Sequence, residues 1–145
     1  MDLKKYKDHF IVMVEAGFIA VNQADEDSAM KLFKAAMLID PKNHLPKVGM
    51  GYMHLCKLEL KQACKIFNEI LAEDPNNEMA KTFLGISMSL NPQEASQGEK
   101  LLEESKEKSH DPSIKTLATS AIEFVEKFVK KNPTPTQGDG KKEKR

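Results

Sequence analysis

Residues 16–41 read AGFIAVNQADEDSAMKLFKAAMLIDP, and residues 50–75 read MGYMHLCKLELKQACKIFNEILAEDP. The two segments share one pattern, in which a glycine is followed at fixed distances by an alanine, a phenylalanine and an Asp-Pro pair. Gly17, Gly51 and Gly85 lie 34 positions apart, so a third copy begins in register with the first two. A fixed period of this length indicates a repeat protein whose units pack against their neighbours.

This period, with small and aromatic residues in these positions, resembles the tetratricopeptide repeat, in which each unit is a pair of antiparallel helices. Glycine costs a helix about 1 kcal/mol relative to alanine, so we expect each glycine to permit a close approach of a neighbouring backbone. Ala29 and Ala63 would supply the small surface opposite the glycines, and Phe33 and Phe67 would fill the space beyond it.

Apolar residues at helical spacing predict seven helices. The expected ranges are 10–22, 26–39, 44–57, 60–73, 78–90, 93–109 and 113–131. Asp40-Pro41 and Asp74-Pro75 should end two of these helices, because proline is not tolerated in a helix interior. Asn91-Pro92 is expected to start the sixth helix, with the proline in its first turn.

The predicted fold class is therefore all-α, with three tetratricopeptide-like hairpins followed by a C-terminal capping helix. The resemblance implies a right-handed solenoid with a concave apolar groove. Residues 1–131 are expected to form this repeat domain. Residues 132–145, rich in proline, glycine and lysine, are predicted to be a disordered basic tail.

Composition argues against several classes of function. The 22 basic and 22 acidic residues balance, so no basic surface indicates nucleic-acid binding. No apolar run approaches the roughly 20 residues that span a bilayer, so we expect no stable membrane insertion. Charged residues interrupt any signal-peptide pattern at the N-terminus, and this predicts a cytoplasmic protein.

No pattern of catalytic residues is present, and we predict a protein that is not an enzyme and that carries no cofactor or metal. The four histidines are scattered and form no HExxH-type pair. Cys56 and Cys64 flank a predicted turn and are interpreted as reduced thiols in packed helices. A regulatory disulfide, or a metal site completed by His54, is the alternative.

The first helices of tetratricopeptide hairpins line the concave face, so their outward positions are the candidate site. These positions are nearly all apolar, and the predicted groove residues are Ile11, Val14, Phe18, Val21, Leu45, Val48, Tyr52, Leu55, Cys56, Met79, Thr82, Ile86 and Ser89. An exposed face of this kind predicts a protein partner that offers an amphipathic helix or an extended apolar segment. The alternative is that these side chains are ordinary core, covered by the N-terminal arm or by a second copy.

The segments Glu15-Ala16-Gly17-Phe18-Ile19-Ala20 and Ala29-Met30-Lys31-Leu32-Phe33 resemble the small tetratricopeptide chaperones of bacterial type III secretion systems, most closely the needle-subunit chaperones. That resemblance implies a groove that holds an amphipathic helix of the needle subunit and prevents premature polymerisation. The residues that would grip this helix are Val14, Phe18, Val48, Tyr52, Leu55 and Ile86.

The resemblance also implies a small helical co-chaperone on the first hairpin, facing Leu3 and Tyr6. Two alternatives remain open from the sequence. One is a chaperone of the pore-forming translocator proteins, which uses the same face for an extended peptide. The other is a helical-repeat scaffold within a larger assembly.

Overall fold

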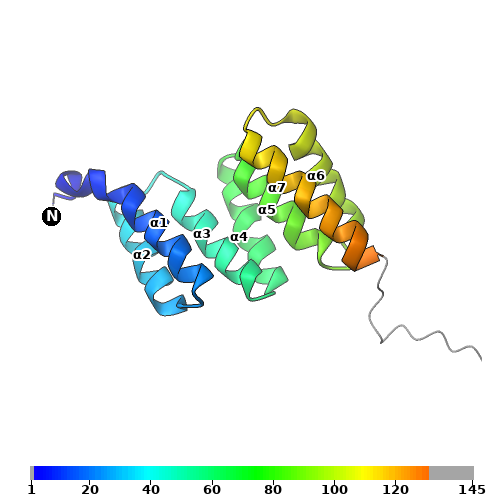
Figure 1. The fold of residues 1–145 in the computed structure, drawn as a ribbon. Helices are drawn as coiled ribbons and strands as arrows, with labels where there is room; N and C mark the ends of the chain where they lie inside the picture. The colour runs from blue at the N-terminus through cyan, green and yellow to red at the C-terminus, as the bar shows by residue number, and fades with distance from the viewer. Residues whose placement is uncertain (1, 131–145) are drawn as a thin grey trace, which may run out of the picture.

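A computed structural model describes residues 2–130 of the chain, and the predicted tail at 132–145 lies outside this range. The described residues form seven α-helices and no strand, which confirms the all-α class (Figure 1). The elements are η1 (Lys4–His9, a 3-10 helix), α1 (Phe10–Asn22), α2 (Glu26–Ile39), α3 (Leu45–Cys56), α4 (Leu60–Glu73), α5 (Glu78–Ser89), α6 (Ala95–Lys108), α7 (Pro112–Phe124) and η2 (Val125–Lys130, a π-helix). None of these helices is long and apolar enough to cross a membrane.

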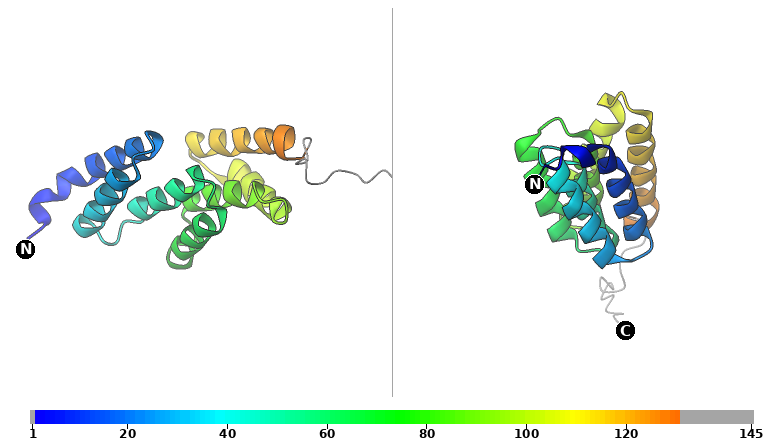
Figure 2. Two further views of the ribbon diagram at one scale, coloured as in Figure 1. Left: turned by 90° about the horizontal axis from the view of Figure 1, so that it is seen from below. Right: turned by 90° about the vertical axis from the view of Figure 1, so that its left-hand side faces the viewer.

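Each helix packs mainly against the next one along the chain, so the helices follow one another as antiparallel hairpins. Contacts between alternate helices join α1 to α3, α3 to α5 and α5 to α7, so these four helices form one side of the molecule. Figure 2 shows the same order, from η1 at one end to α7 and η2 at the other. This arrangement is consistent with helical hairpin repeats.

The turns within the first two hairpins have the same backbone. Ala24 and Leu58, which are 34 residues apart, both adopt a left-handed conformation, with φ of 59° and 58°. The next residue in each turn closes it, because the Asp25 N–H donates to the Ala20 carbonyl and the Glu59 N–H to the His54 carbonyl, both at 2.9 Å. These are the bonds of a helix C-cap of the Schellman type, which needs a left-handed residue.

The third hairpin cannot use this turn, because the corresponding position is Pro92 and proline holds φ near −65°. Its helices are joined instead by a longer turn, Leu90 to Glu94, and α6 begins at Ala95, one residue later than the 34-residue period requires. The expectation that Pro92 lies in the first turn of the sixth helix is therefore wrong. The shift persists along α6, where Leu102 is fully buried in the position that the period assigns to residue 101.

An ion pair between the two helices of a hairpin carries the same shift. Lys47 of α3 contacts Glu69 of α4 at 3.0 Å, and Lys81 of α5 contacts Glu104 of α6 at 3.4 Å. The lysines are 34 residues apart and the glutamates 35. The third hairpin is therefore built like the second, with one residue added in its turn.

The turns between hairpins lie where the Asp-Pro pairs predict them. α2 ends at Ile39 and α4 at Glu73, and the capping residues Asp40 and Asp74 have nearly identical backbones, with φ, ψ of −136°, 84° and −134°, 83°. Such extended angles are what a residue before proline adopts. These two boundaries are confirmed.

The glycines act differently from what the pattern suggests. A Cβ on Gly17 would lie 2.5 Å from the ring of Phe33, and a Cβ on Gly51 would lie 2.5 Å from the ring of Phe67. The first two hairpins therefore use glycine to admit a phenyl ring, and the expected approach of two backbones is wrong for them. It occurs only in the third hairpin, where a Cβ on Gly98 would lie 2.6 Å from the carbonyl oxygen of Gly85.

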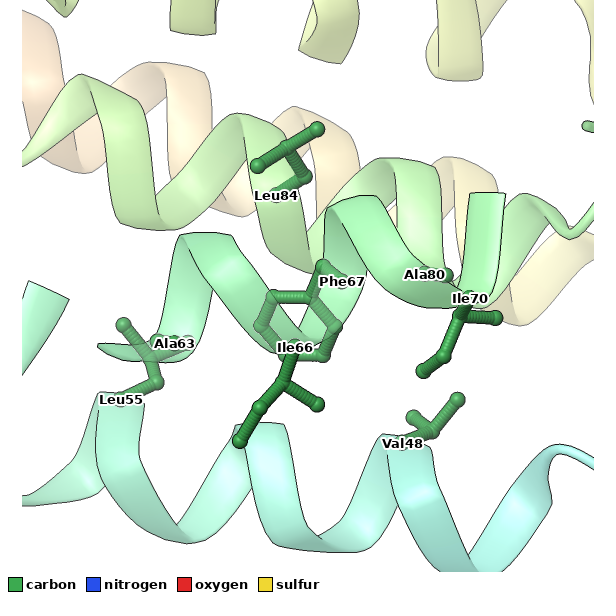
Figure 3. Packing of buried hydrophobic residues seen from close by; sticks show 8 residues of the cluster. All are labelled: Val48, Leu55, Ala63, Ile66, Phe67, Ile70, Ala80 and Leu84. Carbon is green, nitrogen blue, oxygen red and sulfur yellow. The ribbon is translucent and has the colours of Figure 1, made fainter. Parts of the chain in front are cut away.

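The largest core cluster lies between α3, α4 and α5, and Figure 3 shows eight of its residues. Phe67 is fully buried there, between the backbone of Gly51 and neighbouring aliphatic side chains. Phe33 has the same role in the first hairpin. Burying a phenyl ring in this way contributes about 3–5 kcal/mol to stability, judged by the cost of its removal.

Candidate functional site

Several of the predicted groove residues are core residues. Val14 and Val48 are only 2% and 1% exposed, and the other predicted groove residues that are buried are Val21, Leu55, Thr82 and Ser89. Val14 packs with Phe10 and Ala36 between α1 and α2, so its side chain points into the first hairpin. The prediction that these six side chains face outward is wrong, because their helices are rotated so that this edge meets the neighbouring helix.

The remaining predicted groove residues keep exposed surface. Ile11 and Cys56 are exposed, and those that are half-buried are Phe18, Leu45, Tyr52, Met79 and Ile86. They come from α1, α3 and α5, which lie side by side on one face of the molecule. The structure therefore brings together part of the expected set.

A row of aromatic side chains crosses these three helices. The ring centroid of Tyr52 on α3 lies 5.6 Å from that of Phe18 on α1 and 5.4 Å from that of Phe83 on α5. We call Phe18, Tyr52 and Phe83 the aromatic row. All three are half-buried, so one part of each ring packs on the core and another part remains accessible.

The sequence reading missed Phe83. The repeat assigns Ile86 to the position of Phe18 and Tyr52, but the ring that meets Tyr52 comes from Phe83, one helical turn earlier. The available signal was that Phe83 and Ile86 are three residues apart and therefore share a helix face.

Both ends of the aromatic row are attached to buried rings. Phe18 meets Phe33 edge to face at a centroid distance of 5.5 Å, and Phe83 stacks on Phe67 at 5.8 Å. Because Phe33 and Phe67 are the packing centres of the first two hairpins, the row is held by the core. A surface fixed in this way loses little side-chain entropy when it binds a partner.

The hydroxyl group of Tyr52 is also held in place. It donates a hydrogen bond of 2.8 Å to Oδ1 of Asn22, at the end of α1. Burial, reinforced by the neighbouring Cys56, raises the pKa of Tyr52 to about 12. The phenol therefore stays neutral, and the bond ties the first hairpin to the second.

A hollow of about 460 Å³ lies beside this hydrogen bond, between the first turn and the end of α3. Val21, Ala24 and Met53 form its apolar wall, and Cys56 stands at its edge. An ion pair of 2.9 Å between Lys57 and Glu26 closes one side. The hydrogen bonds from Lys57 to Glu59 and Glu26 raise the pKa of this lysine, so it remains charged. The hollow has the size and lining of a pocket for an apolar side chain.

The groups that the sequence reading considered for metal or redox chemistry are engaged separately. Cys56 and Cys64 are both free thiols, and burial raises the pKa of Cys64. His54 pairs through Nδ1 with Glu59. Within residues 2–130 no group of three or more His, Cys, Asp or Glu side chains is placed to hold a metal ion.

The expected co-chaperone residues lie at the N-terminal end. Leu3 is half-buried, and Tyr6 on η1 is exposed, with Nζ of Lys5 5.0 Å from the centre of its ring. The adjoining face of α1 exposes Ile11, Val12 and Ile19, of which the sequence reading named only the first. At the other end, Phe128 was expected to help cover the last hairpin, but it is half exposed and lies against Phe124, with centroids 4.9 Å apart.

Comparison with protein-family models, with curated proteins and with solved structures found no significant match to this chain. The family is therefore not identified, and the function has to be argued from the geometry above.

Proposed function

We propose that this protein is a tetratricopeptide-type repeat that binds an apolar or amphipathic segment of another protein along its aromatic row. The observation that carries the proposal is the continuous contact from Phe18 to Tyr52 to Phe83 on three adjacent helices. Half-exposed aromatic side chains anchored on a core are typical of the residues that dominate binding energy at protein interfaces. The first helices of tetratricopeptide arrays line the concave face of a right-handed solenoid, where such a segment lies.

The more specific form of this proposal is a cytoplasmic type III secretion chaperone. Its support is the resemblance of residues 15–20 and 29–33 to the needle-subunit chaperones, together with the small size of the helical domain. In this form the partner is an amphipathic helix of the needle subunit, kept from polymerising, and a co-chaperone binds near Leu3 and Tyr6.

The aromatic row fits a helix better than an extended peptide. A helix that crosses α1, α3 and α5 would offer apolar residues at i, i+3, i+4 and i+7, and these form one continuous stripe. The row is likewise continuous, and the one hollow with a largely apolar wall described above adjoins Tyr52. A chaperone for extended translocator peptides would need several separate pockets along this face.

Charge substitution in the row tests the proposal. Tyr52→Glu and Phe83→Glu should abolish capture of a synthetic peptide that copies the C-terminal helix of a needle subunit, because a carboxylate would be desolvated at the contact. Leu38→Glu is the matched control, since Leu38 is a large apolar residue exposed on α2, outside the row. Circular dichroism shows whether each variant retains its helices.

Three results separate the possibilities. Loss of capture in folded row variants, with capture kept in the Leu38 variant, supports the chaperone proposal. If the peptide does not bind but a protein co-purifying from the native host depends on the row, the binding surface stands and the needle assignment is wrong. If the row variants bind every partner as the unaltered chain does, the proposal fails.

A further inference from the structure

The outer face of α1 is apolar where a helix at the end of an array is expected to be polar. Ile11, Val12 and Ile19 are each more than half exposed, while the opposite side of α1 packs on α2 and α3. A helix that is apolar on all sides is normally buried on all sides. This face therefore requires a covering surface that residues 2–130 do not supply in one copy.

Charges at the two ends of α1 have opposite sign. Lys4, Lys5 and Lys7 lie on η1, directly before α1, against Asp2 and Asp8. Asp25, Glu26 and Asp27 follow the other end of α1, in the first turn and at the start of α2. Figure 1 shows η1 and this turn at opposite ends of α1. Lys4, Lys7 and Asp27 form no ion pair with any described residue, although Glu26 pairs with Lys57.

We propose that the protein forms a symmetric dimer in which the α1 helices of two copies pack antiparallel through Ile11, Val12 and Ile19. The lysines and the acidic residues lie about equally far from the middle of α1, with the apolar residues between them. A two-fold axis at the middle of the helix therefore sets the basic end of each copy against the acidic end of the other. The occupant of this face is a second copy of the chain.

One residue opposes this arrangement. Glu15 is exposed in the middle of the same face, so the two-fold axis brings two copies of its carboxylate near each other. Like charges that face each other at close range destabilise an interface. A Glu15→Gln variant should therefore dimerise more tightly than the unaltered chain, which is a result that no other use of this face predicts.

Analytical ultracentrifugation of the full chain tests the proposal. The weight-average mass should rise with concentration from 16.3 kDa to twice that value and no further. Ile19→Glu should weaken the dimer at least about tenfold, which corresponds to 1.4 kcal/mol. Leu38→Glu, the matched exposed control on α2, should leave it unchanged.

Charge reversal gives the decisive comparison. The variant Lys4→Glu/Lys7→Glu and the variant Glu26→Lys/Asp27→Lys should each remain monomeric, because each meets its own copy with like charges. An equal mixture of the two should dimerise again, since both ends of the mixed pair are then complementary. Restoration on mixing also shows that both variants are folded.

Other outcomes overturn the proposal. A chain that stays monomeric at every concentration, or that forms species larger than a dimer, excludes it. Reversal variants that fail to restore each other, or a Glu15→Gln variant that dimerises less tightly, also exclude it. If the chain is monomeric alone but a co-purifying protein protects α1 from hydrogen exchange, the face belongs to that protein.

Discussion

Ala24 and Leu58 hold the same left-handed backbone conformation, 34 residues apart, although neither is glycine. Each is the residue at which the chain reverses between the two helices of a hairpin, and each is followed by a backbone hydrogen bond of 2.9 Å that closes the turn. L-residues other than glycine carry a steric cost of roughly 1–2 kcal/mol in this conformation. Each of the first two hairpins therefore turns at a strained residue.

Relieving this strain should stabilise the protein. We expect Leu58→Gly and Ala24→Gly each to raise the free energy of unfolding by about 0.5–1 kcal/mol, the steric gain less the extra entropy of a glycine in the unfolded chain. Urea unfolding measures the change. Leu58→Ala is the matched control, because it removes the exposed side chain and keeps the strain. If the alanine variant gains as much as the glycine variant, strain is not the cause.

Gly51→Ala should destabilise the protein, although alanine is the better helix former. The added Cβ would lie 2.5 Å from the ring of Phe67, and overpacking of this kind typically costs about 1–3 kcal/mol. In a Phe67→Leu background the same substitution should cost clearly less, because the smaller side chain leaves room. Equal costs in the two backgrounds, measured by a double-mutant cycle, would show that the ring is not what excludes the methyl group.

Gly98→Ala should be more damaging than Gly51→Ala. A Cβ on Gly98 would lie 2.5 Å from the backbone nitrogen of Ser89 and 2.6 Å from the Gly85 carbonyl oxygen, and backbone atoms cannot rotate away. We expect a loss at or above the upper end of the overpacking range, about 3 kcal/mol. Gln97→Ala on the exposed side of α6 is the control and should be nearly neutral. Thermal unfolding of the two variants gives the comparison.

The ion pairs of Glu104 should give a small dependence of stability on pH. Hydrogen bonds from Lys108, and then from Lys81, hold the pKa of Glu104 below its ordinary value of 4.5. A carboxylate with a lowered pKa in the folded state stabilises the protein above its unfolded pKa, and this contribution is lost as the pH falls through the lowered value. Exposed pairs contribute only about 0.2–1 kcal/mol, so the effect is modest.

The Glu104→Gln variant measures that contribution. Its melting temperature should be slightly below that of the unaltered chain at pH 7, and the difference should vanish once the pH lies well below 4.5. Glu103→Gln on the same helix is the control, because Glu103 forms no ion pair with any described residue. A difference that persists in acid would show that Glu104 acts through packing and not through charge.

The sequence by itself determined where the helices lie. The predicted ranges of α1, α2 and α4 agree with the structure at both ends, and those of α3 and α5 agree to within a residue. Helix boundaries depend on local chemistry, such as the Asp40-Pro41 pair and the capping side chain of Asn77, whose Oδ1 accepts the Ala80 N–H at 2.9 Å. Signals of this kind act within a few residues and can be read from one chain.

Only the tertiary structure decided which side of each helix is available. Val14 and Phe18 are both apolar and one turn apart on α1, yet Val14 is buried between α1 and α2 and Phe18 reaches Tyr52. An apolar face wider than one neighbour can cover does not say which of its residues the neighbour covers, because the rotation of a helix depends on every helix that packs against it. The ring of Phe83 and the role of Gly51 were settled in the same way, by side chains distant in the sequence that compete for the same space.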